Sequence, residues 1–88
     1  MSQVVQGTLG LGILGPGKHT TWVTNINPAG VWHFWANNTT LGYSPARVRI
    51  EFIDTVREGN AHYVEIHLWN PSASITTGFS LRWSMVFD

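Results

Sequence analysis

Residues 30–36 read Gly-Val-Trp-His-Phe-Trp-Ala, which places two tryptophans, a phenylalanine and a histidine in four consecutive positions. Side chains alternate between the two faces of a β-strand. Trp32 and Phe34 are therefore expected on one face, and His33 and Trp35 on the other. One aromatic face can fill a hydrophobic core. The second face needs another partner: a neighbouring subunit, a flat ligand or a further packed layer.

The chain on both sides of this stretch continues as short alternating runs separated by turn residues. Turn signals occur at residues 15–17, 27–30, 57–60 and 70–74, where Gly, Pro, Asn and Ser gather. Strands are predicted at residues 3–14, 18–25, 31–36, 46–56, 61–69 and 77–87. The chain shows no helical periodicity. The pattern predicts a single all-β domain over residues 1–88, a small antiparallel two-sheet β-sandwich of six to seven strands, with a small barrel as the alternative.

The alternation also predicts which side chains face the core. Strand 77–87 puts Trp83 on the same face as Leu81, so Trp83 is expected in the core. On strand 61–69, the apolar face holds His62, Val64, Ile66 and Leu68. On strand 46–56, it holds Val48, Ile50 and Phe52. The opposite faces carry Arg47, Arg49, Arg82, Glu51 and Glu65, and ion pairs between arginine and glutamate are expected across neighbouring strands.

Composition narrows the classes of function. The formal net charge is zero, and charged residues make up 11% of the chain, compared with about 25% in typical soluble domains. Binding to nucleic acid or to an anionic membrane is therefore not expected. No apolar run reaches the length of a membrane span. Few charges together with 12% aromatic residues favour a homo-oligomer. The absence of cysteine and of a signal-peptide pattern predicts a soluble protein and leaves its compartment open, the extracellular space included.

Catalytic and metal-binding patterns are weak. Glu65 and His67 share a strand face, but one such pair falls short of the three protein ligands of a catalytic zinc site. His62 and His67 are five positions apart and face opposite sides. No nucleophile elbow is present, and the glycines of residues 7–17 precede strand rather than helix, which argues against a phosphate-binding loop. We expect no enzymatic activity, no metal site and no cofactor.

The residues favour binding over catalysis, and two groups combine aromatic rings with planar polar side chains. The first lies on strand 61–69 and consists of Tyr63, Glu65, His67 and Trp69, with Arg47, Arg49 and Arg82 as an extension. The second joins strand 31–36 to the long loop 37–46 and consists of His33, Trp35, Asn37, Asn38 and Tyr43. Sugars are recognised by an aromatic platform and a few placed hydrogen-bonding groups.

The sequence therefore predicts a non-enzymatic, lectin-like carbohydrate-binding protein, made multivalent by homo-oligomerisation. The alternative is a structural or interaction protein whose aromatic faces serve self-assembly or a protein partner. Both hypotheses use the same aromatic residues, because tryptophan is also enriched at subunit interfaces.

Overall fold

The structure, a computed structural model, describes residues 3–39 and 47–87, and its regular elements are all β-strands. They are β1 (Gln3–Leu14), β2 (His19–Asn25), β3 (Val31–Asn38), β4 (Arg49–Glu58), β5 (Ala61–Trp69) and β6 (Thr77–Phe87). All six predicted strands are confirmed, although β3 continues through two asparagines that the sequence assigned to a loop. Among the described residues there is no apolar helix of the length that a membrane crossing requires.

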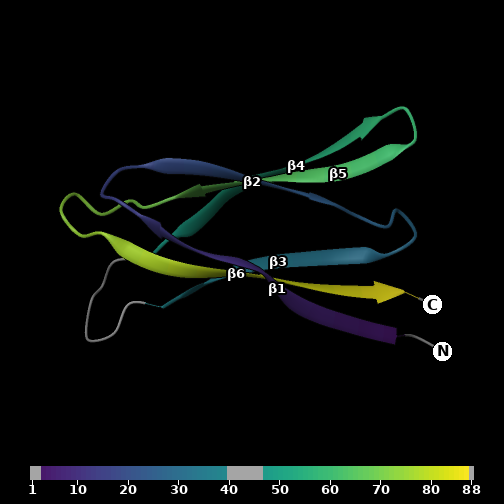
Figure 1. The fold of residues 1–88 in the computed structure, drawn as a ribbon, viewed down its shortest axis with the longest axis horizontal. Coiled ribbons are helices and arrows are strands. Elements are labelled where there is room, and N and C mark those ends of the chain that lie inside the picture. The colour runs from purple at the N-terminus through teal and green to yellow at the C-terminus, as the bar shows by residue number, and fades with distance from the viewer. Residues whose placement is uncertain (1–2, 40–46, 88) are drawn as a thin grey trace.

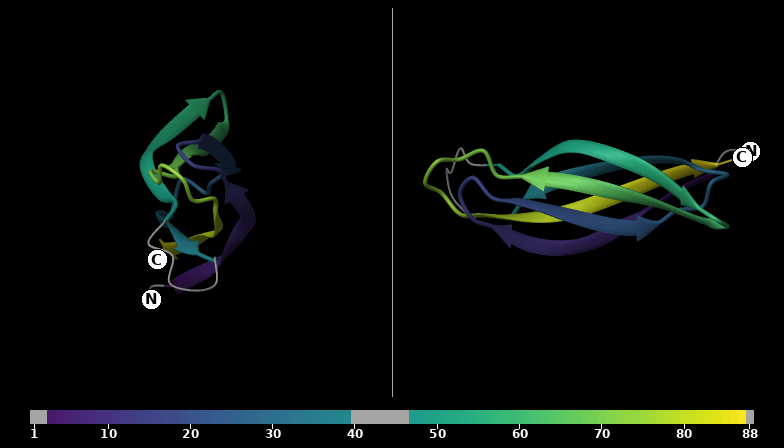
Figure 2. Two further views of the ribbon diagram at one scale, coloured as in Figure 1. Left: turned by 90° about the vertical axis from the view of Figure 1, so that its left-hand side faces the viewer. Right: turned by 90° about the horizontal axis from the view of Figure 1, so that it is seen from above.

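The strands form two antiparallel three-stranded sheets, ordered β1-β6-β3 and β2-β5-β4. Figure 1 shows them edge-on as two layers, and Figure 2 shows the strands running along the long axis of the molecule. The sheets remain separate, so the two-sheet sandwich is confirmed and the small barrel is excluded. The layers diverge toward the end where the β4–β5 hairpin lies (Figure 1).

Two glycines with positive φ make the tight turns. Gly17 (φ 67°) follows Pro16 in a turn closed by a hydrogen bond of 3.2 Å from the Lys18 amide to the Gly15 carbonyl. Proline followed by a positive-φ glycine is the signature of a type II turn. Gly59 (φ 58°) is the first residue of the two-residue connection between β4 and β5, a position that glycine takes in type II′ hairpins.

The core lies between the central strands β5 and β6, each of which has neighbours on both sides. Ile66, Leu68 and Leu81 are completely buried, and Val64 and Phe79 nearly so. The apolar faces predicted for strands 61–69 and 77–87 are therefore confirmed in this middle region. Burying each such side chain contributes about 1.5–3 kcal/mol.

Trp83 faces the interior but is only half-buried, outside the cluster of buried core residues. It lies toward the end where the sheets diverge, with its ring centroid 5.3 Å from that of Trp32. The Trp83 side chain therefore points inward as predicted, but the prediction that it is a core residue is wrong, because it is only half-buried.

The glycines of β1 let aromatic rings lie against the strand backbone. A Cβ atom added to Gly10 would be 2.4 Å from the Trp22 ring, and one added to Gly12 would be 2.6 Å from the Phe79 ring. The Trp22 and Phe79 rings meet edge to face, with centroids 6.5 Å apart. Gly10 thus permits close packing between the two sheets, and Gly12 makes room for a ring from the neighbouring strand of its own sheet, a use of glycine that the strand context predicted.

An irregularity in β4 corrects one prediction. The pairing of β4 with β5 shifts between Ile50 and Phe52, so Glu51 is an extra residue on this edge strand. Phe52, predicted on the core face with Val48 and Ile50, consequently lies on the outer face and is 50% exposed. A one-residue shift reverses the facing of every later side chain on the strand.

Candidate functional site

The outer face of the β1-β6-β3 sheet carries one of the two predicted groups, and we call it the Trp35 face. Phe34 and Ala36 pack against the core, which directs Trp35 outward. In the strand register Trp35 is opposite Arg82 of β6, and Arg82 is opposite Thr8 of β1. The neighbouring rows hold Gln6, Ser84 and His33 on one side, and Leu11, Ser80 and Asn37 on the other.

Several side chains of the Trp35 face have no partner of their own within the part of the chain that the structure describes. Within residues 3–39 and 47–87, no side-chain hydrogen bond, ion pair or ring contact involves Trp35, Arg82, His33 or Asn37. Directly opposite residues on neighbouring strands have Cβ atoms about 4.5–5.5 Å apart. The face therefore presents an aromatic ring beside a guanidinium group, with hydrogen-bonding capacity on both sides.

Two members of the predicted groups lie elsewhere than expected. Asn38 was grouped with Asn37 in a loop, but both residues belong to β3 and alternate in direction. Asn38 turns toward the buried Thr77, whose hydroxyl donates a hydrogen bond of 2.9 Å to the Asn38 side-chain oxygen. Arg82 was assigned to the Tyr63–Trp69 group and instead lies beside Trp35, on the other sheet. Tyr43 is outside the described residues.

The outer face of the β2-β5-β4 sheet carries the other group, and we call it the His67 face. Tyr63, Glu65, His67 and Trp69 alternate with the buried residues of β5, so they share this face as predicted. The face is largely paired internally. His19 Nδ1 and Glu51 Oε1 are 2.5 Å apart, and the His19 ring stacks on Trp69 with centroids 5.8 Å apart.

His67 is the centre of the His67 face. Its Nδ1 lies 3.1 Å from the Thr21 hydroxyl, and the Phe52 ring stacks on the imidazole with centroids 4.1 Å apart. Its Nε2 lies 3.6 Å from Asp54 Oδ2 and 3.6 Å from Glu65 Oε2. The prediction of ion pairs between arginine and glutamate is thus wrong for the described residues. Glu51 and Glu65 lie beside histidines instead.

Tyr63 has a pKa that differs from its ordinary value. Desolvation of the phenol, followed by the charges of Glu58 and Glu65, raises the pKa of Tyr63 above its ordinary value of 10.0. A hydrogen bond to the Glu58 carboxylate acts in the same direction. Each of these effects disfavours the phenolate.

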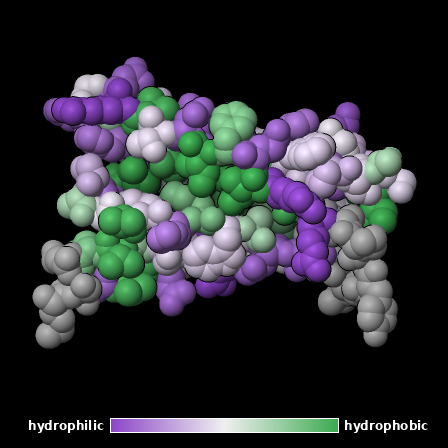
Figure 3. Space-filling model, turned by 180° about the vertical axis from the view of Figure 1, so that it is seen from behind, coloured by the Kyte–Doolittle hydropathy of each residue, from purple (hydrophilic) through white to green (hydrophobic). Residues whose placement is uncertain are grey.

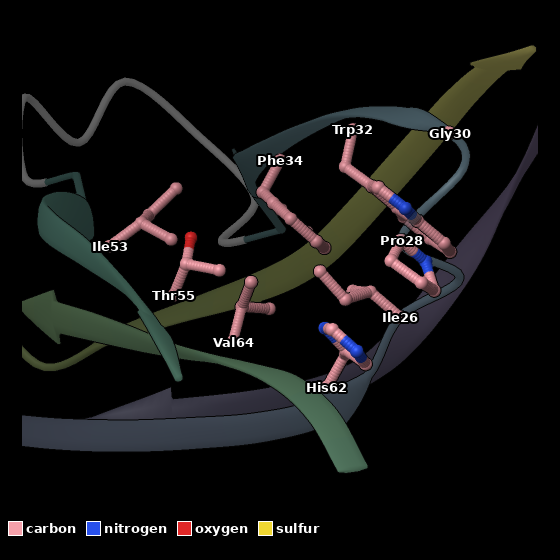
Figure 4. Close-up of a pocket in the computed structure, with 9 residues that line it drawn as sticks. All are labelled: Ile26, Pro28, Gly30, Trp32, Phe34, Ile53, Thr55, His62 and Val64. Atoms are coloured by element: carbon pink, nitrogen blue, oxygen red, sulfur yellow. The ribbon is translucent and has the colours of Figure 1, made fainter. Parts of the chain in front are cut away.

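A third candidate, which the sequence did not predict, is a cleft of about 360 Å³ between the sheets. Trp32 and Phe34 project from β3 toward side chains of β4 and β5 (Figure 4). The two rings are stacked, with centroids 6.0 Å apart. The lining residues are Ile26, Pro28, Gly30, Trp32, Phe34, Ile53, Thr55, His62 and Val64.

The cleft exists because the two sheets diverge, which leaves the inner aromatic residues partly uncovered. Ile53, one of the lining residues, is 40% exposed. Apolar residues also reach the surface on the side of the molecule away from the view of Figure 1 (Figure 3). Trp32 and Phe34, expected to fill a core, are consequently only half-buried. The sequence signal that could have indicated the cleft is His62, a polar residue on the inner face of its strand.

No protein-family model, curated protein or solved structure matches this chain. The functional conclusion therefore depends on the geometry of these three surfaces.

Proposed function

We propose that this protein is a non-enzymatic, lectin-like carbohydrate-binding protein and that the Trp35 face is its binding site. One observation carries the proposal: Trp35 and Arg82 are direct cross-strand neighbours on an open sheet face, and neither has another partner among the described residues. The His67 face contains similar residue types, but its histidines already contact carboxylates and aromatic rings.

The chemistry of the face suits a sugar. An indole ring offers an apolar platform for the C–H groups of a pyranose. The planar guanidinium of Arg82 can donate two parallel hydrogen bonds to neighbouring hydroxyls or to a carboxylate. His33, Asn37 and Ser84 add donors and acceptors around the ring. The rows of the Trp35 face contain no carboxylate, whereas glycoside hydrolysis ordinarily uses two.

Multivalency is part of the proposal, because a shallow site on a flat sheet binds a single sugar weakly. Linked copies of a weak site raise the overall avidity by about 10²–10⁴-fold when the ligand can reach several sites at once. A homo-oligomer of this chain would provide such copies. The low charge content of the chain favours association, because a highly charged surface would keep monomers apart.

The test is a glycan array with labelled protein, in which the oligomeric state of the same sample is measured by light scattering. We expect selective binding that free sugar competes away. Trp35→Ala and Arg82→Gln should each weaken it at least tenfold. Trp69→Ala is the matched control, because it removes a tryptophan from the outer face of the other sheet. An empty array from folded protein, or loss of binding only in Trp69→Ala, would refute the proposal.

A second function, self-assembly or binding of a protein partner, is favoured by a different observation. Leu11 and Ile13 on the outer face of β1 are 72% and 78% exposed, and Val4 and Val31 at the other end of the sheet are 62% and 63% exposed. Exposed apolar residues on an edge strand are typical of interfaces. Leu11→Ser together with Ile13→Ser should convert an oligomer held by this surface to monomer, as measured by light scattering.

A further inference from the structure

Asp54, Glu65 and His67 converge on the His67 face, away from the proposed sugar site. Glu65 and His67 come from β5, and Asp54 comes from the neighbouring strand β4. One ligand atom from each residue lies within 4.8 Å of the other two. We propose that these three side chains bind a divalent transition-metal ion of the Zn²⁺ class.

The two distances from His67 to the carboxylates match the edges of a metal tetrahedron. Nitrogen and oxygen ligands lie about 2.0–2.2 Å from Zn²⁺, so tetrahedral ligand atoms are about 3.3–3.6 Å apart. His67 Nε2 is 3.6 Å from an oxygen of Asp54 and 3.6 Å from an oxygen of Glu65. These distances are too long for hydrogen bonds. The Asp54 and Glu65 oxygens lie within 4.8 Å of each other, so an ion between the three atoms would draw these two carboxylates closer together.

The surroundings of the His67 imidazole suit a metal ligand. Its Nε2 is buried from solvent and has no hydrogen-bond partner among the described residues. Its other nitrogen, Nδ1, lies 3.1 Å from the Thr21 hydroxyl. If Nδ1–H donates to that oxygen, Nε2 carries the free lone pair that a metal needs. A ligand histidine almost always donates its second ring N–H to an oxygen acceptor in this way.

The positions of the two carboxylates also favour a bound cation. Asp54 and Glu65 are directly opposite in the β4–β5 register. Like charges at such positions destabilise a sheet. Neither carboxylate has an ion pair with arginine or lysine among the described residues, and the nearer rows of this face hold Val23, Thr21, Val56 and Phe52. A metal ion would remove the repulsion and bind the edge strand β4 to β5.

The donor set selects the class of ion. Imidazole nitrogen suits Zn²⁺, Co²⁺, Ni²⁺ and Cu²⁺, whereas Mg²⁺ and Ca²⁺ prefer sites made of oxygen alone. Three protein ligands leave one tetrahedral position open to water or to another ligand. Asp54 is the most exposed ligand, so the open position faces solvent.

The experiment is calorimetric titration of metal-free protein with Zn²⁺, repeated with Co²⁺ to read the coordination geometry from its visible spectrum. We expect one site per chain, with a tetrahedral Co²⁺ spectrum. Asp54→Asn and Glu65→Gln should each weaken binding at least tenfold, and His67→Gln should abolish it. Thr21→Val should weaken it about 10–100-fold, and Thr21→Ser should restore it.

Two controls separate this site from general histidine binding. His19→Gln removes a histidine that also has a carboxylate and an aromatic neighbour but lacks a third ligand, and His33→Gln removes an exposed histidine of the other sheet. Both should leave Zn²⁺ binding unchanged. Absence of binding, or equal loss in His19→Gln and His67→Gln, would overturn the proposal.

Thermal unfolding provides a second readout that does not require measuring affinity. With a chelator present, Asp54→Asn should raise Tm, because it relieves the repulsion with Glu65. With Zn²⁺ present, the wild type should gain stability and Asp54→Asn should not. If Zn²⁺ leaves the wild-type Tm unchanged at saturating concentration, the proposal is wrong.

Discussion

Asn70 and Leu14 lie 56 positions apart in the chain, yet the Asn70 side-chain amide donates a hydrogen bond of 2.9 Å to the Leu14 carbonyl. The same amide donates to the Ile75 carbonyl at 2.8 Å, and its oxygen accepts from the Ser72 amide at 3.1 Å. Asn70 is completely buried. This one side chain therefore holds the end of β1 against the connection between β5 and β6.

Replacing Asn70 should be strongly destabilising. In Asn70→Leu the carbonyls of Leu14 and Ile75 lose their donors, and unsatisfied buried polar groups cost about 1–3 kcal/mol each. We expect a loss of about 3 kcal/mol in the free energy of unfolding, measured in urea. Asn27→Ala is the control, because the Asn27 side chain accepts one exposed hydrogen bond, from Ala29, and should cost about 0.5–1 kcal/mol. Equal losses in the two variants would contradict this role for Asn70.

Gly10→Ala should destabilise through overpacking. The new Cβ would be 2.4 Å from the Trp22 ring, which is itself held against Phe79. Such overpacking typically costs about 1–3 kcal/mol. Combining Gly10→Ala with Trp22→Phe should recover part of the loss, because the smaller ring leaves space. Additive effects in the double-mutant cycle would show that Trp22 is not the obstacle.

Gly17→Ala should also destabilise the protein, but for a different reason. A Cβ atom at Gly17 would have nothing within 4 Å, so crowding is absent. The cost comes from the positive φ of 67°, which is unfavourable by about 1–2 kcal/mol for a residue with a Cβ. Since no side chain causes this loss, Trp22→Phe should not rescue it. Chemical denaturation of the single and double variants checks this.

Trp83 on the inner face and Trp35 on the outer face of the same sheet should respond differently to truncation. Trp83 packs on Trp32 and covers Gly7, so Trp83→Ala should reduce stability by about 3 kcal/mol, at the low end for a tryptophan because the residue is half-buried. Trp35 is also partly buried, but its ring has no aromatic contact among the described residues, so Trp35→Ala should cost about 1 kcal/mol. If Trp35→Ala unfolds the protein, the Trp35 face is instead an interior surface.

Tyr63 predicts how stability changes at alkaline pH. Because its pKa is raised in the folded protein, the unfolded chain loses the phenol proton first. The stability linked to Tyr63 is therefore complete below pH 10.0 and is lost as pH rises through the higher folded pKa. Glu58→Gln should lower the pKa of Tyr63 in an ultraviolet titration of tyrosinate, with Tyr63→Phe identifying the signal. An unchanged titration in Glu58→Gln would exclude the carboxylate as a cause.

Local patterns in the sequence were enough to predict the strands, the turns and most side-chain directions. Alternation placed Trp35 and His33 on one face of β3, and Tyr63 and His67 on one face of β5. These properties follow from neighbours along the chain, because strand facing has a period of two residues. Proline and glycine likewise determine turns through their own φ preferences.

Contacts between distant strands decided the rest. Only the register of β3 with β6 brings Arg82 beside Trp35, and only that of β4 with β5 brings Asp54 opposite Glu65. The extra residue Glu51 moves Phe52 onto His67, and the divergence of the sheets opens the cleft beside Trp32. Register and sheet separation result from pairing and packing over the whole fold, so no local run of residues specifies them.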